Sequence, residues 1–290
     1  MRKQFFLVTA ICAFCGIAVL SARIAPARQS PNSAPAESRD YLGFDRNTYP
    51  GDAALPTLRK TFSFTGYWLN NPPGESANTW RGKREILNST GFGFLLLFNG
   101  RLYKDLKTVA RAKVIGVQDS AAAVAAAKRE GFPAGAIIFL DQEQGGHMLP
   151  AQRAYLHSWI DGIIAAGFRA GIYCSGIVAT ENGEGGVTTA NDIRDGAAGR
   201  KIAFFIYNDS CPPSPGCATP ANPPSPAQSG VPFATVWQFA QSPRRPEYTS
   251  KCGAHYDADG NCYAPLFPRA NAIEIDVSSA TSADPSAARR

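Results

Sequence analysis

Two carboxylates follow one strongly apolar segment, and their spacing suits acid–base chemistry. The run 137–140 (IIFL) leads directly into Asp141, Gln142 and Glu143. Because side chains alternate along an extended chain, Asp141 and Glu143 point the same way, about 6–7 Å apart. Two carboxylates this close repel each other, which raises the pKa of one of them. A protonated acid beside a charged partner is what cleavage of a glycosidic bond requires.

Two further acids lie at or near the ends of apolar segments, one in the first such segment and one in the last. Asp45 ends the segment 41–45 (YLGFD), and Asp276 lies late in the segment 272–277 (AIEIDV). An acid at the end of a buried strand is costly unless it is paired, hydrogen-bonded or functional. The alternatives are ordinary solvated strand ends, or a structural role in which Asp45 or Asp276 only orients a loop. We interpret the four acids as one candidate catalytic group: Asp45, Asp141, Glu143 and Asp276.

Aromatic and amide side chains also gather where apolar segments end. Aromatic faces stack on sugar rings, and amides hydrogen-bond to hydroxyl or acetamido groups. For any single aromatic residue, packing in the top layer of a barrel is the alternative. The candidate substrate-binding residues are Tyr67, Trp68, Tyr173, Tyr207, Asn208, Trp237 and Gln238.

Other reactive side chains form no site by their spacing. His147, His157 and His255 lack metal-ligand spacing, and Ser175 lacks the G-x-S-x-G turn of serine hydrolases. Residues 257–261 (DADGN) resemble the start of a calcium loop without its final glutamate, which favours a disulfide-closed turn instead. We therefore expect neither a metal nor a cofactor.

The segments that must position these residues alternate between strand-like and helical patterns. We expect strands over 41–46, 62–69, 93–98, 136–140, 169–174, 202–207, 234–239 and 272–277, and helices over 81–89, 119–130, 151–166 and 190–199. Several strands are apolar throughout, which is typical of parallel strands covered on both faces. Eight such units in about 250 residues predict the α/β class and a single-domain (β/α)₈ TIM-like barrel. A doubly wound sheet is the alternative.

The connections between the expected strands differ in length and in helical content. Clear helices are missing after the first strand and between the last two. The Pro-rich segment 211–232 and the segment 241–271 are long loops that follow late strands, so they would border the C-terminal rim. In a closed barrel the first and eighth strands are neighbours. Asp45 and Asp276 would then lie side by side, facing the mouth that holds Asp141 and Glu143.

The beginning of the chain is typical of an exported protein. Residues 1–27 combine Arg2 and Lys3 with an apolar run and a site for cleavage after Ala27. The alternative is an uncleaved N-terminal anchor, which would be the only contact with a membrane. We expect a flexible linker over 28–39, a barrel over 40–282 and a disordered tail over 283–290. The predicted location is periplasmic or secreted.

Cysteine usage agrees with export. Four cysteines bracket two loops, and we expect them to form disulfides. One loop lies between Cys211 and Cys217, and the other lies between Cys252 and Cys262. The most economical pairing is local, within each loop, although spacing alone does not fix the pairing. Cys174 would remain unpaired on a buried strand.

Composition and charge exclude some classes of protein. The chain has 290 residues, 44% hydrophobic and 18% charged, which excludes a wholly disordered protein. The net charge of +6 comes from 29 basic and 23 acidic residues. Part of the excess lies in residues 1–27, which contain no acid, and no basic stripe follows a predicted helix. Nucleic acid is therefore not an expected partner.

In order and placement, the short motifs resemble the family 25 glycoside hydrolases, the lysozyme-like muramidases. They resemble more closely a related secreted glycoside hydrolase-like barrel family of unknown function. The resemblance covers about residues 41–280 and implies a TIM-like barrel that acts on the cell-wall glycan. The motifs are G-F-D at Gly43–Asp45, D-x-E at Asp141–Glu143, G-I-Y at Gly171–Tyr173, W-Q at Trp237–Gln238 and I-D-V at Ile275–Val277.

The resemblance also implies roles for the acids. Glu143 would be the general acid, and Asp141 would orient the acetamido group or stabilise the positive charge at the anomeric carbon. Asp45 and Asp276 correspond to the acids of the first and last strands. We expect an enzyme that hydrolyses peptidoglycan glycan. The alternatives are an inactive glycan-binding or envelope-remodelling module on the same barrel, and an enzyme for another polysaccharide.

Overall fold

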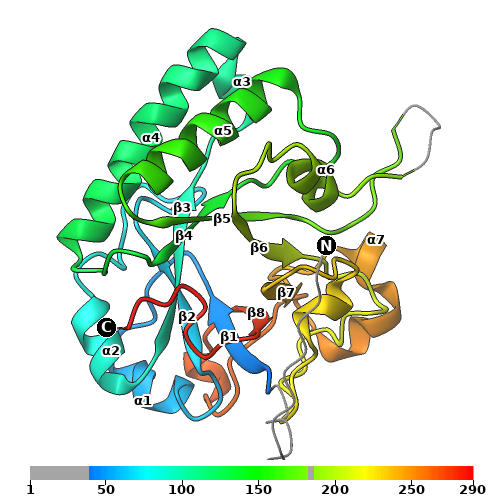
Figure 1. Cartoon of the computed structure of the whole chain (residues 1–290). Coiled ribbons are helices and arrows are strands. Elements are labelled where there is room, and N and C mark those ends of the chain that lie inside the picture. The colour runs from blue at the N-terminus through cyan, green and yellow to red at the C-terminus, as the bar shows by residue number, and fades with distance from the viewer. Residues whose placement is uncertain (1–38, 182–185, 290) are drawn as a thin grey trace, which may run out of the picture. The chain divides into compact units, whose positions relative to one another are not determined.

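Eight strands close into a barrel in chain order in the computed structural model, which describes residues 39–181 and 186–289 (Figure 1). Strands β1 to β7 are parallel, and β8 is antiparallel to both of its neighbours, β7 and β1. The prediction of an α/β barrel is confirmed, with one strand reversed. The strands are β1 (Tyr41–Asp45), β2 (Phe64–Trp68), β3 (Gly93–Asn99), β4 (Ile137–Asp141), β5 (Arg169–Ser175), β6 (Ile202–Tyr207), β7 (Val236–Ala240) and β8 (Asp276–Ala280).

The position and direction of β8 differ from the sequence prediction. A parallel strand over 272–277 was expected, but the strand begins at Asp276 and runs the other way. The physical reason is the missing helix between the last two strands. A parallel strand needs a crossover that returns the chain to the opposite end of the barrel. Without that crossover the chain stays at the C-terminal rim and re-enters from there, so Asp276 still lies at this rim.

Aromatic rings fill the inside of the barrel below that rim. The rings of Phe139 and Phe205 meet edge to face with centroids 6.1 Å apart, and Tyr173 packs on Phe205 at 4.7 Å. Gly171 on β5 makes room for them, because a Cβ there would collide with the Phe139 ring. The barrel is therefore a packed core with space left only at its ends.

Helices cover the barrel unevenly. The long helices α4 and α5 pack against each other beside β3, β4 and β5 (Figure 1). The β1–β2 and β7–β8 connections carry only short helices, as the missing helical patterns indicated. The helices are α1 (Leu55–Leu58), α2 (Arg84–Thr90), α3 (Tyr103–Leu106), α4 (Val109–Arg129), α5 (Pro150–Ala165), α6 (Thr189–Asp195) and α7 (Pro246–Thr249), with short 3₁₀ turns at Asp52–Ala54, Pro226–Ser229, Ser250–His255 and Arg269–Asn271.

Helix α4 is longer than its Ala-rich part suggested. The sequence placed its start near Asp119, but it begins at Val109, and the Thr108 side chain caps it by accepting a hydrogen bond from the Arg111 amide. Asp119 is instead buried in the helix. Its carboxylate accepts two hydrogen bonds of 2.8 Å from Arg101 and one of 3.0 Å from the Tyr155 hydroxyl. Those partners explain why an acid is tolerated inside a helix.

The C-terminal segment is ordered over 283–289, so the expectation of a disordered tail is wrong for these residues. The Asp284 carboxylate accepts a hydrogen bond from the Phe94 amide at 2.9 Å. Ser286 is fully buried and exchanges backbone hydrogen bonds with Phe94 and Ile137. These partners lie at the beginnings of β3 and β4, so the segment seals the N-terminal end of the barrel and satisfies its free backbone groups.

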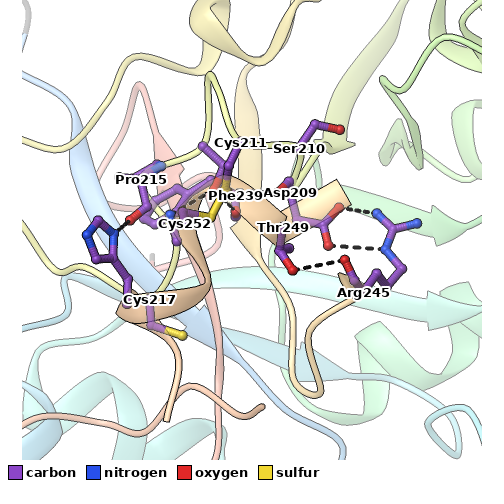
Figure 2. The surroundings of a disulfide bond; sticks show 12 residues. Asp209, Ser210, Cys211, Pro215, Cys217, Phe239, Arg245, Thr249 and Cys252 are labelled. Atoms are coloured by element: carbon purple, nitrogen blue, oxygen red, sulfur yellow. Dashed lines mark hydrogen bonds and ion pairs between the residues drawn. A yellow bond between two sulfur atoms is a disulfide. The ribbon is translucent and has the colours of Figure 1, made fainter. Parts of the chain in front are cut away.

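Two disulfides link the long loops to each other rather than closing each loop on itself. Cys211 pairs with Cys252 (Figure 2), and Cys217 pairs with Cys262. The four cysteines were identified correctly, but the local pairing was wrong. Cys174 is buried and unpaired, as expected. The loops after β6 and β7 fold over each other at the rim, and this contact decides the pairing.

Removing the Cys211–Cys252 bond should destabilise the fold. Its ends are 41 residues apart, and a crosslink over such a loop is worth about 2–4 kcal/mol through the entropy of the unfolded chain. We expect the double substitution Cys211→Ser, Cys252→Ser to lower the free energy of unfolding by about that amount in urea titrations. Substitution of Cys174 by Ala is the matched control for losing a thiol. An unchanged urea midpoint in the double variant would contradict the prediction.

Three predictions lie outside the described residues: the export signal over 1–27, its alternative as an anchor, and nearly all of the linker over 28–39. Within the described ranges, no helix is long and apolar enough to cross a membrane.

Candidate active site

All four acids of the candidate group line one cavity at the C-terminal rim of the barrel. We call it the central pocket, and its volume is about 150 Å³. Strands β1, β4 and β8 supply the acids or lead into them. The pocket is lined by Asp45, Asn47, Trp68, Pro73, Leu97, Asp141, Glu143, Tyr173, Phe205, Gln238, Gln241 and Asp276.

Asp45 and Asp276 are paired across the β1–β8 seam. They are direct partners in the antiparallel register, and the Gln238 amide group lies between them. Its Nε2 donates to both carboxylate oxygens of Asp45, at 3.2 and 3.1 Å, and weakly to Asp276 at 3.4 Å. The Ser242 amide donates to Asp276 at 2.6 Å. One amide group therefore holds two carboxyl groups in a fixed position.

The pKa values of both carboxyl groups in this pair are raised. Burial raises the pKa of Asp45 to about 7, against the hydrogen bond from Gln238, which lowers it. Burial and the nearby charge of Asp45 raise the pKa of Asp276 well above its ordinary value. Two close carboxyl groups titrate as a unit, so the raised pKa values belong to the pair and not to either acid alone.

Asp141 and Glu143 lie on the opposite side of the ring, at the end of β4. Asp141 is buried, and its Oδ1 has no hydrogen-bond partner among the described residues. Burial raises its pKa well above the ordinary value, and the charges of Glu143 and Asp45 add to this. Glu143 is exposed, so of the four acids it is the most accessible to a ligand. The two pairs thus face each other across the pocket.

Glycine on β2 creates the space for Asp45. A Cβ on Gly66 would lie 2.6 Å from the Cβ of Asp45 and 3.2 Å from the Leu97 side chain. Any larger residue there would push Asp45 out of the barrel. The sequence analysis did not single out this glycine, since its role depends on the β1–β2 register.

A hydrogen-bond network fixes the polar wall on the β5–β7 side. The Tyr173 hydroxyl donates to Gln238 Oε1 at 2.6 Å, and Gln241 Nε2 donates to both Tyr173 Oη and Gln238 Oε1, at 3.0 and 2.8 Å. The Tyr207 hydroxyl donates to the Glu143 carbonyl at 3.0 Å, which anchors the backbone that carries the exposed acid. These groups hold Gln238 with its amide nitrogen toward the acids.

The aromatic and amide candidates divide into two sets. Trp68, Tyr173 and Gln238 line the central pocket, and Tyr207 supports Glu143 from behind. Three others do not line the pocket: Tyr67, Asn208 and Trp237.

Each of the three has a structural partner instead. The Tyr67 hydroxyl donates to Glu130 at 2.6 Å, the Asn208 amide to the Ser229 carbonyl at 2.7 Å, and the Trp237 indole to the Asn208 carbonyl at 2.8 Å. Alternation explains the two aromatic cases, because Tyr67 precedes Trp68 and Trp237 precedes Gln238 on a strand. These three side chains therefore contact other parts of the described structure and do not line the central pocket.

Several residues that line the pocket were not predicted from the sequence. Gln241 follows Gln238 by three residues, and Asn47 follows Asp45 by two, so proximity to the motifs was the available indication. The sequence gives no such indication for three apolar residues of the lining, because apolar residues in these positions are equally typical of a core. They are Pro73, Leu97 and Phe205. In the described ranges, no group of three or more His, Cys, Asp or Glu side chains could hold a metal ion.

A surface ion pair lies between the disulfide-linked loops and the rim. Arg245 pairs with the buried carboxylate of Asp209 (Figure 2), and its guanidinium lies over the Tyr207 ring, 5.3 Å from the centroid. The disulfide Cys211–Cys252 lies beside this pair in the same view. The crosslinked loops therefore brace Tyr207, which in turn supports the Glu143 backbone.

Residues 74–203 match the family described as Rv2525c-like, glycoside hydrolase-like domain. This match confirms, for this segment, the closer of the two resemblances, the one to a glycoside hydrolase-like family. The matched segment includes Asp141, Glu143 and Tyr173. No curated protein matches the chain significantly in sequence.

One solved structure supports the fold, and two others align with lower TM-scores. An uncharacterized protein of B. stearothermophilus aligns with a TM-score of 0.52 and 17% identity, over 82% of this chain and 94% of that one. The Tat-secreted protein Rv2525c of Mycobacterium tuberculosis, in complex with L-tartrate, aligns at 0.48 and 14% identity, over 83% and 94%. The catalytic domain of endolysin ply40, from bacteriophage P40 of Listeria monocytogenes, aligns at 0.44 and 12%, over 83% and 93%.

Proposed function

We propose that this chain, with its glycoside hydrolase-like domain of the Rv2525c type, hydrolyses glycosidic bonds in the peptidoglycan of a cell wall. The bond would be a β-1,4 linkage next to N-acetylmuramic acid. The observation that carries the proposal is the convergence of four acids on one pocket, two on each side, at the rim where barrel enzymes place their chemistry. The match to a glycoside hydrolase-like family supports it.

Glu143 is the proposed general acid. It is the exposed member of the group, so it can reach the oxygen of a bond that lies over the pocket. Cleavage needs a proton on that oxygen as the bond to the anomeric carbon breaks. Asp141 lies deeper beside it, where a neutral carboxyl can hydrogen-bond to an acetamido group. In its ionised form Asp141 would stabilise the positive charge at the anomeric carbon.

The Asp45–Asp276 pair faces the other side of the sugar. Its first ionisation lies near neutral pH, so it can both hold and accept a proton under ordinary conditions. The Gln238 amide keeps the two carboxyl groups in place while the charge changes. Glycoside hydrolysis needs at least an acid and a base on opposite sides of the bond that is cleaved.

The first experiment is hydrolysis by the purified protein. Clearing of cell-wall peptidoglycan in a zymogram, with reducing ends released into solution, is the expected result. Soluble chitin oligomers, incubated in parallel, separate a peptidoglycan hydrolase from an enzyme for another polysaccharide. Absence of product from wall material across a range of pH values would refute the lytic function.

The inactive binding module is the second candidate, and it rests on Trp68 lining the pocket. Two matched substitutions test the role of this ring. Trp68→Phe and Trp237→Phe each remove an indole that donates to a backbone carbonyl, of Arg46 and Asn208 respectively, but only Trp68 lines the pocket. We expect Trp68→Phe to weaken retention on insoluble peptidoglycan by about three- to tenfold, and Trp237→Phe to leave it unchanged. Equal effects would show that Trp68 does not stack on the glycan.

Export also belongs to this proposal. The two disulfides favour an oxidising compartment, the periplasm or the outside of the cell, and this is where peptidoglycan lies. The pattern of residues 1–27 supplies the means of export.

A further inference from the structure

A second chamber opens beside the central pocket, above the seam between β1 and β8. Its volume is about 290 Å³. Asn47 and Asp276 line both cavities, so the two share a wall. The chamber is therefore directly adjacent to the central pocket. The other lining residues are Arg46, Thr48, Glu75, Ser242, Glu274 and Ile275.

Arg46 is the unusual residue of this chamber. It follows Asp45 directly, and its backbone is fixed because the Trp68 indole donates to its carbonyl at 3.2 Å. Its side chain is half-buried, and Nε is covered without any hydrogen-bond partner among the described residues. Burial lowers the pKa of Arg46, and the charge of Glu274 offsets this only in part. A covered donor without an acceptor is costly, and a ligand that supplies the acceptor would relieve that cost.

The other titratable groups of the chamber carry negative charge, but they are better solvated or neutralised. Glu75 and Glu274 are exposed, so water and salt screen their charges. Burial raises the pKa of Asp276 well above its ordinary value, which favours the neutral form of this carboxyl group. The least solvated charge in the chamber is therefore the Arg46 guanidinium. Guanidinium groups match carboxylates best, through two parallel hydrogen bonds.

We propose that the second chamber binds a carboxylate on the sugar unit adjacent to the hydrolysed bond, and that Arg46 recognises it. The proposal rests on the proposed function for the position of that bond, and it adds a class of substrate. A glycan whose units carry carboxylates, as ether-linked acids or uronic acids, fits the two cavities together. A neutral polymer of N-acetylated sugars supplies no carboxylate to Arg46 Nε, the donor that has no partner among the described residues.

The test is a binding measurement that needs no turnover. Calorimetry is carried out on the Glu143→Gln protein with two probes. One is the disaccharide N-acetylglucosaminyl-β-1,4-N-acetylmuramic acid, and the other is the same disaccharide with its carboxylate converted to the methyl ester. We expect the acid to bind about ten- to a hundredfold more tightly than the ester, as a charged bidentate pair predicts.

Variants of the chamber assign the preference to Arg46. In the Glu143→Gln protein, the further substitution Arg46→Gln should reduce the ratio of the affinities for the acid and the ester to about one. The substitution Arg46→Lys should retain a smaller preference for the acid. Glu274→Gln removes an opposing charge and should tighten binding of the acid without changing that of the ester. If Glu274→Gln weakens binding of the acid instead, the charge of Glu274 does not oppose the bound carboxylate and the inference is overturned.

The outcomes separate this inference from the proposed function. A preference for the acid that depends on Arg46, in a protein whose wild type releases no product, supports the chamber and refutes the hydrolase. Hydrolysis with equal binding of acid and ester refutes the chamber alone. Failure of both probes to bind refutes the inference as well.

Discussion

Replacing Glu143 with glutamine should lower the rate of peptidoglycan hydrolysis by about 10²–10⁴-fold, the contribution expected of a general acid. Glutamine keeps the size and polarity of the side chain but cannot donate a proton of comparable acidity. Glu143 is exposed, and its only hydrogen bond in the described structure is made by its carbonyl, which accepts from Tyr207. The substitution should therefore leave the fold intact. Release of reducing ends from purified peptidoglycan, measured for both proteins, gives the ratio.

The matched control is Glu247→Gln. Glu247 is an exposed glutamate on α7 that does not line the central pocket, so its substitution should leave the rate unchanged. Thermal unfolding of all three proteins excludes misfolding as the cause. A Glu143→Gln protein that retains more than about a tenth of the wild-type rate would show that another group donates the proton. Asp141, the buried neighbour, would then be the next candidate.

Replacing Asp45 with asparagine should stabilise the protein at neutral pH and abolish its activity. The pKa of Asp45 is about 7 in the folded protein and about 3.9 in an unfolded chain. Between these values the folded state holds more protons than the unfolded state, so Asp45 makes stability fall as pH rises through this window. A difference of about three pKa units corresponds to about 4 kcal/mol at pH 7 and above. Asparagine does not ionise and escapes this cost.

Urea titrations at pH 4.5 and pH 8 measure this effect. We expect the free energy of unfolding of Asp45→Asn to exceed that of the wild type by about 2–4 kcal/mol at pH 8, and by much less at pH 4.5. Asp105→Asn, which replaces an exposed acid on α3 that does not line the central pocket, is the matched control. An equal difference at both pH values would mean that Asp45 is not protonated in the folded state. A variant that is more stable but inactive is typical of a buried catalytic charge.

The central pocket connects chemistry and stability in this protein. Three of its four acids have raised pKa values because they are buried with little compensation. The barrel tolerates them because Gln238 and the Ser242 amide supply hydrogen bonds and because Gly66 leaves room. The loops that brace this rim are held together by the disulfides. A site of this kind is expected to be the least stable part of the barrel in hydrogen exchange.

The local pattern of the sequence was sufficient to locate the first seven strands and the four acids that line the central pocket. Apolar runs that end abruptly in Asp45 or Asp141 reveal where a buried strand reaches solvent, because an acid inside the run would be too costly. The number of runs predicted a closed barrel, and closure placed the first and last strands side by side. The same reasoning held for α5, whose apolar periodicity is regular from one end to the other.

Contacts between distant segments decided the rest. The reversal of β8, the pairing of Cys211 with Cys252, and the outward orientation of Tyr67 and Trp237 all depend on how the rim loops and strands meet in space. The second chamber exists only because the residue after β1 and the residues before β8 are brought together by antiparallel pairing. Burial and alternation are local properties that a sequence displays, whereas the register and direction of pairing are set by the free energy of packing the whole barrel.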